Sequence, residues 1–200
     1  MSLNAGLREF IELLNSRGIE YVIVGAHSLA FHARPRYTGD LDILVRPSPE
    51  NAAKLVSLLR DFGFAKGDLA ESDFTVPEQM IQLGRAPNRI DLLTSISGVT
   101  VAEAFSTRMS TELEGLPVFV LSKEALIRNK RAVGRPQDIA DLEMLEESYN
   151  LPLRTAAAGR PRHRSHNPRG EGERATLESI RPLADRLFAR GQEQGVRAGR

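Results

Sequence analysis

At 200 residues the chain is long enough for one ordinary domain with a sizeable core, and its 27 basic and 26 acidic residues leave a formal net charge of +1 at pH 7. It contains no cysteine, which excludes disulfides, zinc–thiolate sites and thiol nucleophiles and leads us to expect a cytoplasmic protein. No uncharged apolar run approaches roughly 18 residues, and the N-terminus lacks the basic and apolar regions of a secretory signal, so we expect neither a membrane span nor export.

The small net charge conceals two segments of opposite charge. Residues 151–200 carry 11 arginines, no lysine and 5 acidic residues, a balance of +6, which leaves −5 for residues 1–150. The stretch 154–174 is rich in Arg, Gly and Pro and almost without large apolar side chains, which is typical of disorder. We therefore predict a folded domain over 1–150 and an arginine-rich, largely disordered tail over 151–200, with a short helix at 175–190. The tail is either attracted to RNA or an acidic partner, or simply a solvating extension.

The first half of the domain alternates helices and strands. Hydrophobic periodicity and turn residues predict, in order, helix 4–17, strand 21–25, helix 26–33, loop 33–39, strand 41–45 and a helix from 48–49 to about 61. Ser48 and Pro49 define the start of the last helix, because serine caps a helix and proline is accepted in its first turn. Gly63 is expected to end it.

The second half is richer in strands. The pattern predicts strands at 74–84, 89–95 and 116–122, followed by one helix over 123–130 and another from 136 to about 149. Ser122 is the expected cap of the first of these helices, and Pro136 lies in the first turn of the second. This order indicates an α/β (α+β) domain, in which a mixed β-sheet carries flanking helices and ends in C-terminal helices.

Two aspartates interrupt the apolar strand GDLDILV at 39–45. Side chains alternate along a strand, so Asp40 and Asp42 point to one face while Leu41 and Ile43 point into the core. Two carboxylates on a half-buried face need a cation, hydrogen bonds or shifted pKa values, and their oxygens suit a hard cation such as Mg²⁺. The alternative is a turn at the strand start, with Asp40 solvated and Asp42 at an edge.

Two further features favour a metal site. The strand at 21–25 leads through Gly25 into a helix start, where backbone amides attract phosphate, although a tight turn alone would also explain the glycine. Asp91 in RIDLL is a third carboxylate among strand residues. It joins the pair if its strand neighbours 40–45, and is otherwise an ordinary edge-strand aspartate.

With these residues the chain resembles the nucleotidyltransferase superfamily of the DNA polymerase beta type, in its minimal bacterial form. VGA, a spacer of thirteen residues and DLDI are similar to its signature of Gly, then Gly or Ser, a spacer and an Asp–x–Asp pair, with a third carboxylate on a later strand. The stretches VGAHSLAFHARPRYTGDLDILV, RIDLLTSISGV and LIRNKRAVGRPQDIADLEML look like one bacterial subgroup, related to AbiEii-type toxins and nucleotidyltransferase-like proteins of toxin–antitoxin and phage-defence loci. The resemblance covers roughly residues 5–147.

The resemblance implies a site and a reaction. Asp40, Asp42 and Asp91 would be the catalytic carboxylates and the ligands of Mg²⁺ or Mn²⁺, and the amides of the glycine turn, including that of Ala26, would hold the phosphates of a nucleoside triphosphate. Ala26 departs from the superfamily's Gly or Ser, so a hydroxyl contact to phosphate would come from elsewhere, with Ser28 as the candidate. The reaction would move a nucleoside monophosphate onto an acceptor hydroxyl and release pyrophosphate.

Basic residues offer further phosphate contacts. Arg36, just before the acid pair, would meet phosphate or equally pair with a surface acid. Lys130 lies in a basic cluster before a helix whose first turns carry Asp138 and Asp141 on one face. In related toxins a C-terminal lysine and aspartate join the active site, which implies that Lys130 neutralises triphosphate charge. The alternative is a solvated basic turn, with Asp138 stabilising the helix N-terminus.

The leading hypothesis is therefore a metal-dependent nucleotidyltransferase acting on an RNA 3′ end, a partner protein or a small molecule. The alternative is a catalytically silent NTP-binding or antitoxin-type interaction module with the same fold, which the substitution at Ala26 keeps open and the intact acids disfavour. A third interpretation, a nucleic-acid adaptor led by its arginine tail, requires the acids to be incidental.

Overall fold

The structure is a computed structural model that describes residues 5–64, 69–85 and 88–150. The predicted tail over 151–200, with its helix at 175–190, lies outside the described residues. In chain order the elements are α1 (Ala5–Ser16), β1 (Tyr21–Ile23), α2 (Gly25–His32), β2 (Asp40–Val45), α3 (Pro49–Leu59), β3 (Met80–Leu83), β4 (Arg89–Leu93), α4 (Val101–Ser106), β5 (Met109–Leu113), β6 (Leu116–Val120), α5 (Lys123–Val133) and α6 (Pro136–Asn150).

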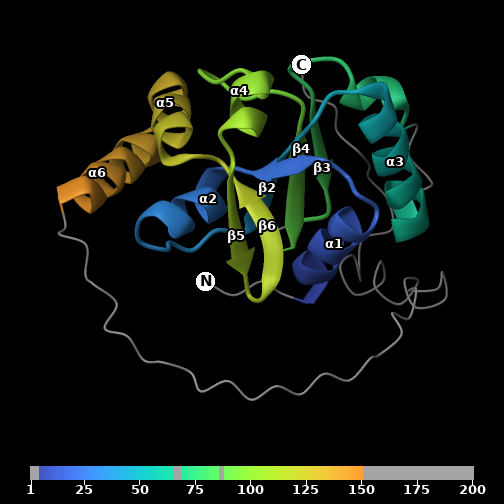
Figure 1. Ribbon diagram of the computed structural model, residues 1–200, viewed down its shortest axis with the longest axis horizontal. Helices are drawn as coiled ribbons and strands as arrows, with labels where there is room; N and C mark the ends of the chain where they lie inside the picture. The colour runs from blue at the N-terminus through green and yellow to red at the C-terminus, as the bar shows by residue number, and fades with distance from the viewer. Residues whose placement is uncertain (1–4, 65–68, 86–87, 151–200) are drawn as a thin grey trace.

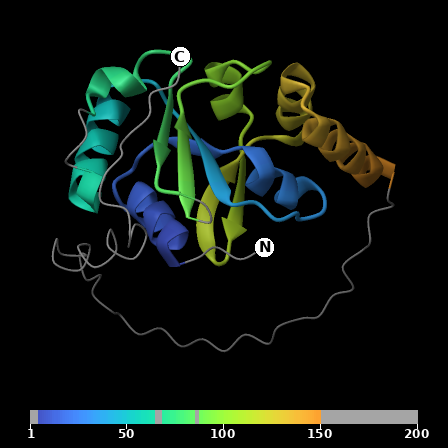
Figure 2. The same ribbon diagram turned by 180° about the vertical axis from the view of Figure 1, so that it is seen from behind.

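The centre of the fold is a six-stranded mixed sheet in the order β3-β4-β2-β1-β6-β5. The four inner strands combine one antiparallel pair, β1 with β2, and two parallel pairs, β2 with β4 and β1 with β6. The outer strands β3 and β5 run antiparallel to their neighbours. In Figures 1 and 2, α1 and α3 lie on one side of the sheet and α2, α5 and α6 on the other. The predicted α/β (α+β) class, a mixed sheet with flanking and C-terminal helices, is confirmed.

Each face of the sheet has its own apolar layer. Leu41 and Ile43 are fully buried and belong to the layer beneath α1 and α3, as the alternation along the strand predicts. Leu44 of the same strand belongs to the opposite layer, together with residues of α2 and α5. Asp40 and Asp42 share that second face, so β2 carries its carboxylates on the side covered by the C-terminal helices. None of the helices in the described ranges is long and apolar enough to cross a bilayer.

The capping residues begin the helices where the sequence predicts. The Ser48 hydroxyl accepts a hydrogen bond from the Asn51 amide at 3.3 Å, with Pro49 in the first turn, and the Ser122 hydroxyl accepts from the Ala125 amide at 3.4 Å. The α-helix α3 ends at Leu59, and in the turn that follows over Arg60–Phe64 the chain leaves the helical conformation at Gly63, whose φ is 98°. These ends follow from local side-chain chemistry, which is why the sequence alone locates them.

The prediction of one strand over 74–84 is wrong in its first half. Glu71–Phe74 forms a 3₁₀ turn, Phe74 is fully buried, and strand pairing begins only at Met80. Between them Glu78 adopts a positive φ of 62°, which no strand residue does. Phe74 fills the core from a turn, whereas Val76 is 48% exposed, so the hydrophobicity of this stretch does not reflect strand pairing.

Candidate active site

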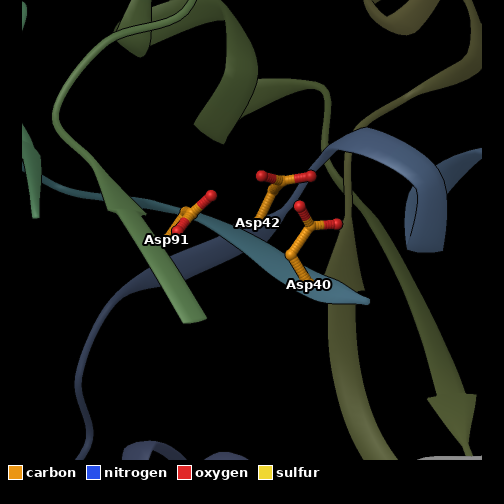
Figure 3. A group of neighbouring side chains, drawn as sticks. All are labelled: Asp40, Asp42 and Asp91. Atoms are coloured by element: carbon orange, nitrogen blue, oxygen red, sulfur yellow. The ribbon is translucent and has the colours of Figure 1, made fainter. Parts of the chain in front are cut away.

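The register of two parallel strands brings three carboxylates together. β2 and β4 pair with Asp42 directly opposite Asp91, so the strand of Asp91 does neighbour 40–45. Figure 3 shows Asp40 and Asp42 projecting from β2 and Asp91 from β4, with their carboxylates on one side of the sheet. One oxygen from each of the three carboxylates lies within 4.8 Å of those of the others. We call these residues the acid cluster.

Burial and mutual repulsion make the acid cluster electrostatically unfavourable without a cation. The pKa of Asp42 is raised to about 6: burial is the largest cause, and the negative charges of Asp40 and Asp91 act in the same direction, against the opposing effect of Arg89 and Lys130. Burial also raises the pKa of Asp91. Its Oδ1 is buried and has no hydrogen-bond partner among the described residues. Three converging carboxylates with an unsatisfied oxygen are a donor set that fits a hard divalent cation.

Arg89 is a further member of this site, which the sequence motifs above do not include. It lies opposite Asp40 in the strand register, and its guanidinium is hydrogen-bonded to Oδ2 of Asp40 and lies 3.1 Å from Oδ2 of Asp91. Thr38 donates a hydrogen bond to the other oxygen of Asp40. The sequence did contain a signal, because Arg89 and Asp91 are two apart in a strand and must share a face.

Gly25 is required by a close approach to the acid cluster. It begins α2 with a φ of +60°, and a Cβ added there would press on Oδ2 of Asp42, 2.9 Å from its Cγ. The amide of Val24, one residue earlier, donates to the Asp42 carbonyl at 3.0 Å. The turn therefore holds the N-terminus of α2, including the Ala26 amide, directly against Asp42, where backbone donors favour an anion.

Ser28, which we expected to supply a hydroxyl to phosphate, has its hydroxyl engaged within the core. Ser28 is fully buried, and its hydroxyl donates to the Leu121 carbonyl at 3.2 Å. It lies one turn into α2, on the side that packs against the end of β6, so the hydroxyl joins α2 to the sheet instead of facing the acid cluster.

Lys130 and Arg36 meet on a buried carboxylate of α6. Asp141 has no exposed surface; it accepts from Lys130 Nζ at 2.7 Å and from Arg36 Nε and Nη2 at 3.0 and 3.2 Å. Lys130, 5% exposed, also bonds Asp138 at 2.8 Å. Lys130 is thus not the solvated residue of the alternative interpretation, and it lies near enough to Asp42 to lower that residue's pKa. Arg36 pairs with an acid, although a buried one.

A cavity of about 240 Å³ borders α2. Its lining includes Ile23, His27, Phe31, Pro35, Val118 and Leu113, but none of the three aspartates. His27 is 8% exposed, and its Nδ1 lacks a hydrogen-bond partner in the part of the chain that the structure describes. Burial accordingly lowers the pKa of His27, which favours the neutral ring.

A comparison with solved structures found several similar chains. Among solved structures the chain is similar to the lincosamide antibiotic adenylyltransferase LnuA in its lincomycin-bound form, with 13% identity and a TM-score of 0.49 over 74% of this chain and 98% of that one. It is also similar to a putative nucleotidyltransferase from Thermotoga maritima, with 18% identity and a TM-score of 0.44 over 72% and 90% of the two chains. An antigenic nucleotidyltransferase-like protein from Paracoccidioides brasiliensis shares 18% identity, with a TM-score of 0.45 over 71% and 72%.

The family comparison is the decisive one. A search of curated proteins found no match. The sequence matches the family described as "Nucleotidyl transferase of unknown function (DUF2204)" over residues 4–164, which is most of the chain and contains the whole acid cluster and the glycine turn. The protein therefore belongs to this family of nucleotidyl transferases.

Proposed function

We propose that the protein is a metal-dependent nucleotidyltransferase that moves a nucleoside monophosphate from an NTP to a hydroxyl acceptor. The observation that carries this proposal is the convergence of Asp40, Asp42 and Asp91 within 4.8 Å, beside a helix N-terminus held at Gly25. The carboxylates would hold one or two Mg²⁺ or Mn²⁺ ions. Bound there, a divalent cation neutralises triphosphate charge and stabilises the attacking and leaving oxygens of a displacement at phosphorus.

The acid cluster also offers a proton acceptor. In the proposed reaction the acceptor oxygen forms a bond to the α-phosphorus, the bond from that phosphorus to the β-phosphate breaks, and pyrophosphate leaves with the electron pair. The acceptor hydroxyl must lose its proton. Asp91 is suited to take it, because its buried Oδ1 lacks a partner among the described residues and its pKa is raised by burial.

The remaining chemistry is positioning and charge compensation. The amides at the start of α2, from Gly25 and Ala26 onward, are proposed to bind the terminal phosphates. Lys130, held by two carboxylates close to Asp42, would contribute positive charge to the triphosphate, and Arg36 would do so from the loop that precedes β2. Since Ser28 is committed to the core, the protein would use backbone donors in place of a hydroxyl.

The acceptor is proposed from the resemblance to toxin–antitoxin and defence proteins, as an RNA 3′ end or a hydroxyl of a partner protein. The same resemblance, together with the cysteine-free sequence, is our reason for expecting a cytoplasmic protein. The other candidate function is a silent binding module, which has the same fold and binds a nucleotide but does not transfer a nucleoside monophosphate. Transfer of a radioactive label from the α-phosphate of an NTP to an acceptor therefore distinguishes the enzyme from the silent module directly.

The experiment incubates the full-length protein with Mg²⁺ and each α-labelled NTP in the presence of total RNA, a protein lysate or its small-molecule fraction. We expect label on one acceptor class, reduced roughly 100-fold or more in Asp42→Asn. The matched control is Asp61→Asn, which removes a surface carboxylate paired with Arg17 at 2.8 Å. Absence of transfer with every NTP and acceptor, in a folded protein that still binds nucleotide, would establish the silent module instead.

A further inference from the structure

Tyr37 exposes an aromatic ring in the loop that leads into the acid cluster. It is 82% exposed, the highest value among the large apolar side chains in residues 5–64, 69–85 and 88–150, where Ile139 follows at 55%. An aromatic side chain that could bury 150–250 Å² normally contributes that area to a core or an interface. A ring left this exposed, in the loop that leads into β2, points to a ligand and not to packing within the chain.

The backbone that carries this ring is held on both sides. On the N-terminal side Arg36 binds the buried Asp141 through two nitrogens, at 3.0 and 3.2 Å, and its third nitrogen donates to the Tyr37 carbonyl at 3.5 Å. On the C-terminal side the Thr38 hydroxyl donates to Asp40 in the acid cluster. The loop is therefore fixed to α6 and to the site at once, and a ligand stacking on Tyr37 would not have to order it.

The surroundings of Tyr37 match a nucleotide. It lies three positions before Asp40, so the two Cα atoms are at most about 10 Å apart, within the reach of one nucleotide whose phosphate is at the acid cluster. Arg34 and Arg36 place two cations in the same loop, and Arg34 has no ion pair within the described part of the chain. A planar ring with cations beside it is the usual platform for a nucleobase and its phosphate.

We propose that Tyr37 is a stacking platform for a nucleobase whose phosphate lies at the acid cluster. The base belongs either to the donor NTP or to the terminal nucleotide of an acceptor strand; the chemistry is the same. This inference rests on the proposed function, since it assumes that a nucleotide reaches the carboxylates. Tyr37 is then a binding residue, and it takes no part in the chemical step.

The absence of tryptophan from the sequence provides a direct probe. In full-length Tyr37→Trp the indole is the sole tryptophan, and we expect its fluorescence to be quenched by a stacked base in the presence of Mg²⁺. The four NTPs test the donor base, a short RNA oligonucleotide with a 3′ hydroxyl tests the acceptor base, and inorganic tripolyphosphate tests phosphate without a base and should not quench. Quenching by NTPs identifies the donor, and quenching by the oligonucleotide identifies the acceptor.

Affinity measurements complete the test. Tyr37→Ala should weaken binding of the responding ligand roughly 5- to 150-fold, which corresponds to the stacking of one base, while Tyr37→Phe retains it and tripolyphosphate binding stays unchanged. Phe119→Trp is the control. Phe119 is 38% exposed and lies on β6, which is separated from β2 by β1. The fluorescence of a tryptophan at this position should not change when nucleotide is added.

The outcomes separate the two proposals. If Tyr37→Ala binds NTPs and the oligonucleotide as tightly as wild type, the platform is excluded while the proposed function is untouched. If Tyr37→Trp responds to nucleotides but no variant transfers label, the platform stands and the proposed function falls. If the wild type binds neither NTPs nor the oligonucleotide, both are excluded.

Discussion

The guanidinium of Arg89 bridges Asp40 and Asp91, hydrogen-bonded to Oδ2 of the first and 3.1 Å from Oδ2 of the second. These oxygens belong to the same carboxylates that would hold a divalent cation. The side chain of Arg89 is 30% exposed, so it can withdraw toward solvent. The chain thus supplies its own counter-ion to the acid cluster, and a metal must compete with it.

The first prediction follows from that competition. Arg89→Gln should strengthen binding of Mn²⁺ to the protein by roughly tenfold, because a charge-assisted hydrogen bond of about 1.5–3 kcal/mol no longer holds the carboxylate oxygens. Without metal the same variant should be less stable than wild type, since three carboxylates then lack their counter-ion. Calorimetric titration with Mn²⁺ measures the first effect, and urea unfolding in EDTA the second.

The control for this variant is Arg128→Gln. Arg128 also pairs with a carboxylate, that of Glu103, but both side chains are substantially exposed and neither belongs to the acid cluster. It should change neither the affinity for Mn²⁺ nor, by more than a few tenths of a kcal/mol, the stability. Unchanged or weaker Mn²⁺ binding in Arg89→Gln would mean that Arg89 supports the metal site and does not compete for it.

The second prediction concerns the glycine turn. Gly25→Ala places a Cβ against the Asp42 carboxylate and a side chain on a residue with a φ of +60°. The backbone strain alone is about 1–2 kcal/mol, and displacing Asp42 adds to it. We expect stability to fall by about 2 kcal/mol or more, and both metal binding and label transfer to be lost.

Gly18→Ala is the control that distinguishes backbone strain from the steric clash with Asp42. Gly18 has nearly the same φ, +58°, but an added Cβ would meet nothing within 4 Å. Its destabilisation in urea should be limited to the backbone strain of about 1–2 kcal/mol, with metal binding intact. Equal effects of the two substitutions on Mn²⁺ affinity would show that the contact between Gly25 and Asp42 is not what the site requires.

The local part of the fold was predictable from the sequence, and the non-local part was not. Ser48 and Ser122 each accept a hydrogen bond from an amide three residues later, so the local sequence is enough to identify them as helix caps. α4 was missed although Thr100 caps it through the Glu103 amide, because six residues give little periodicity. β5 was missed because its side chains are largely exposed or half-buried and it forms a strand only through pairing with β6.

In the candidate site, too, the local relationships were predictable from the sequence and the non-local ones were not. The two-residue period of a strand predicts that Asp40 and Asp42 share a face, and the same rule would have paired Arg89 with Asp91. The partner of Arg36, by contrast, is Asp141, which lies 105 positions away in α6. No local pattern links a loop to a helix at that separation. The burial of Ser28 was hidden for a similar reason, since its acceptor is the Leu121 carbonyl at the end of β6.

A third prediction is a pH dependence that follows from Asp42. Its pKa is raised from 3.8 to about 6 in the folded protein, so between these values the folded state binds more protons than the unfolded state. Stability without metal must therefore fall as pH rises through this interval and level off above about 6. Asp42→Asn should remove most of this slope and be more stable than wild type at pH 7.5, by about 3 kcal/mol.

Protonation of Asp42 also predicts how the affinity for Mn²⁺ depends on pH. Below pH 6 a proton competes for the Asp42 carboxylate, so affinity for Mn²⁺ should decrease by up to about tenfold per pH unit. Urea midpoints in EDTA and Mn²⁺ titrations, both from pH 4.5 to 8, measure the two effects. A wild-type stability curve parallel to that of Asp42→Asn across this range would contradict the assignment.

The fourth prediction concerns the carboxylate that joins α5, α6 and the loop before β2. Burial alone would raise the pKa of Asp141, but hydrogen bonds from Arg36 and Lys130 outweigh it and lower the pKa. Asp141→Ala leaves the buried Lys130 and the half-buried Arg36 without this partner, so we expect a loss of about 3 kcal/mol in urea unfolding at pH 7. Glu146→Ala is the control, because its pair with Arg131 is exposed on both sides and contributes little. If the two variants were equally stable, Asp141 would not be the residue that holds the loop and Lys130 beside the acid cluster.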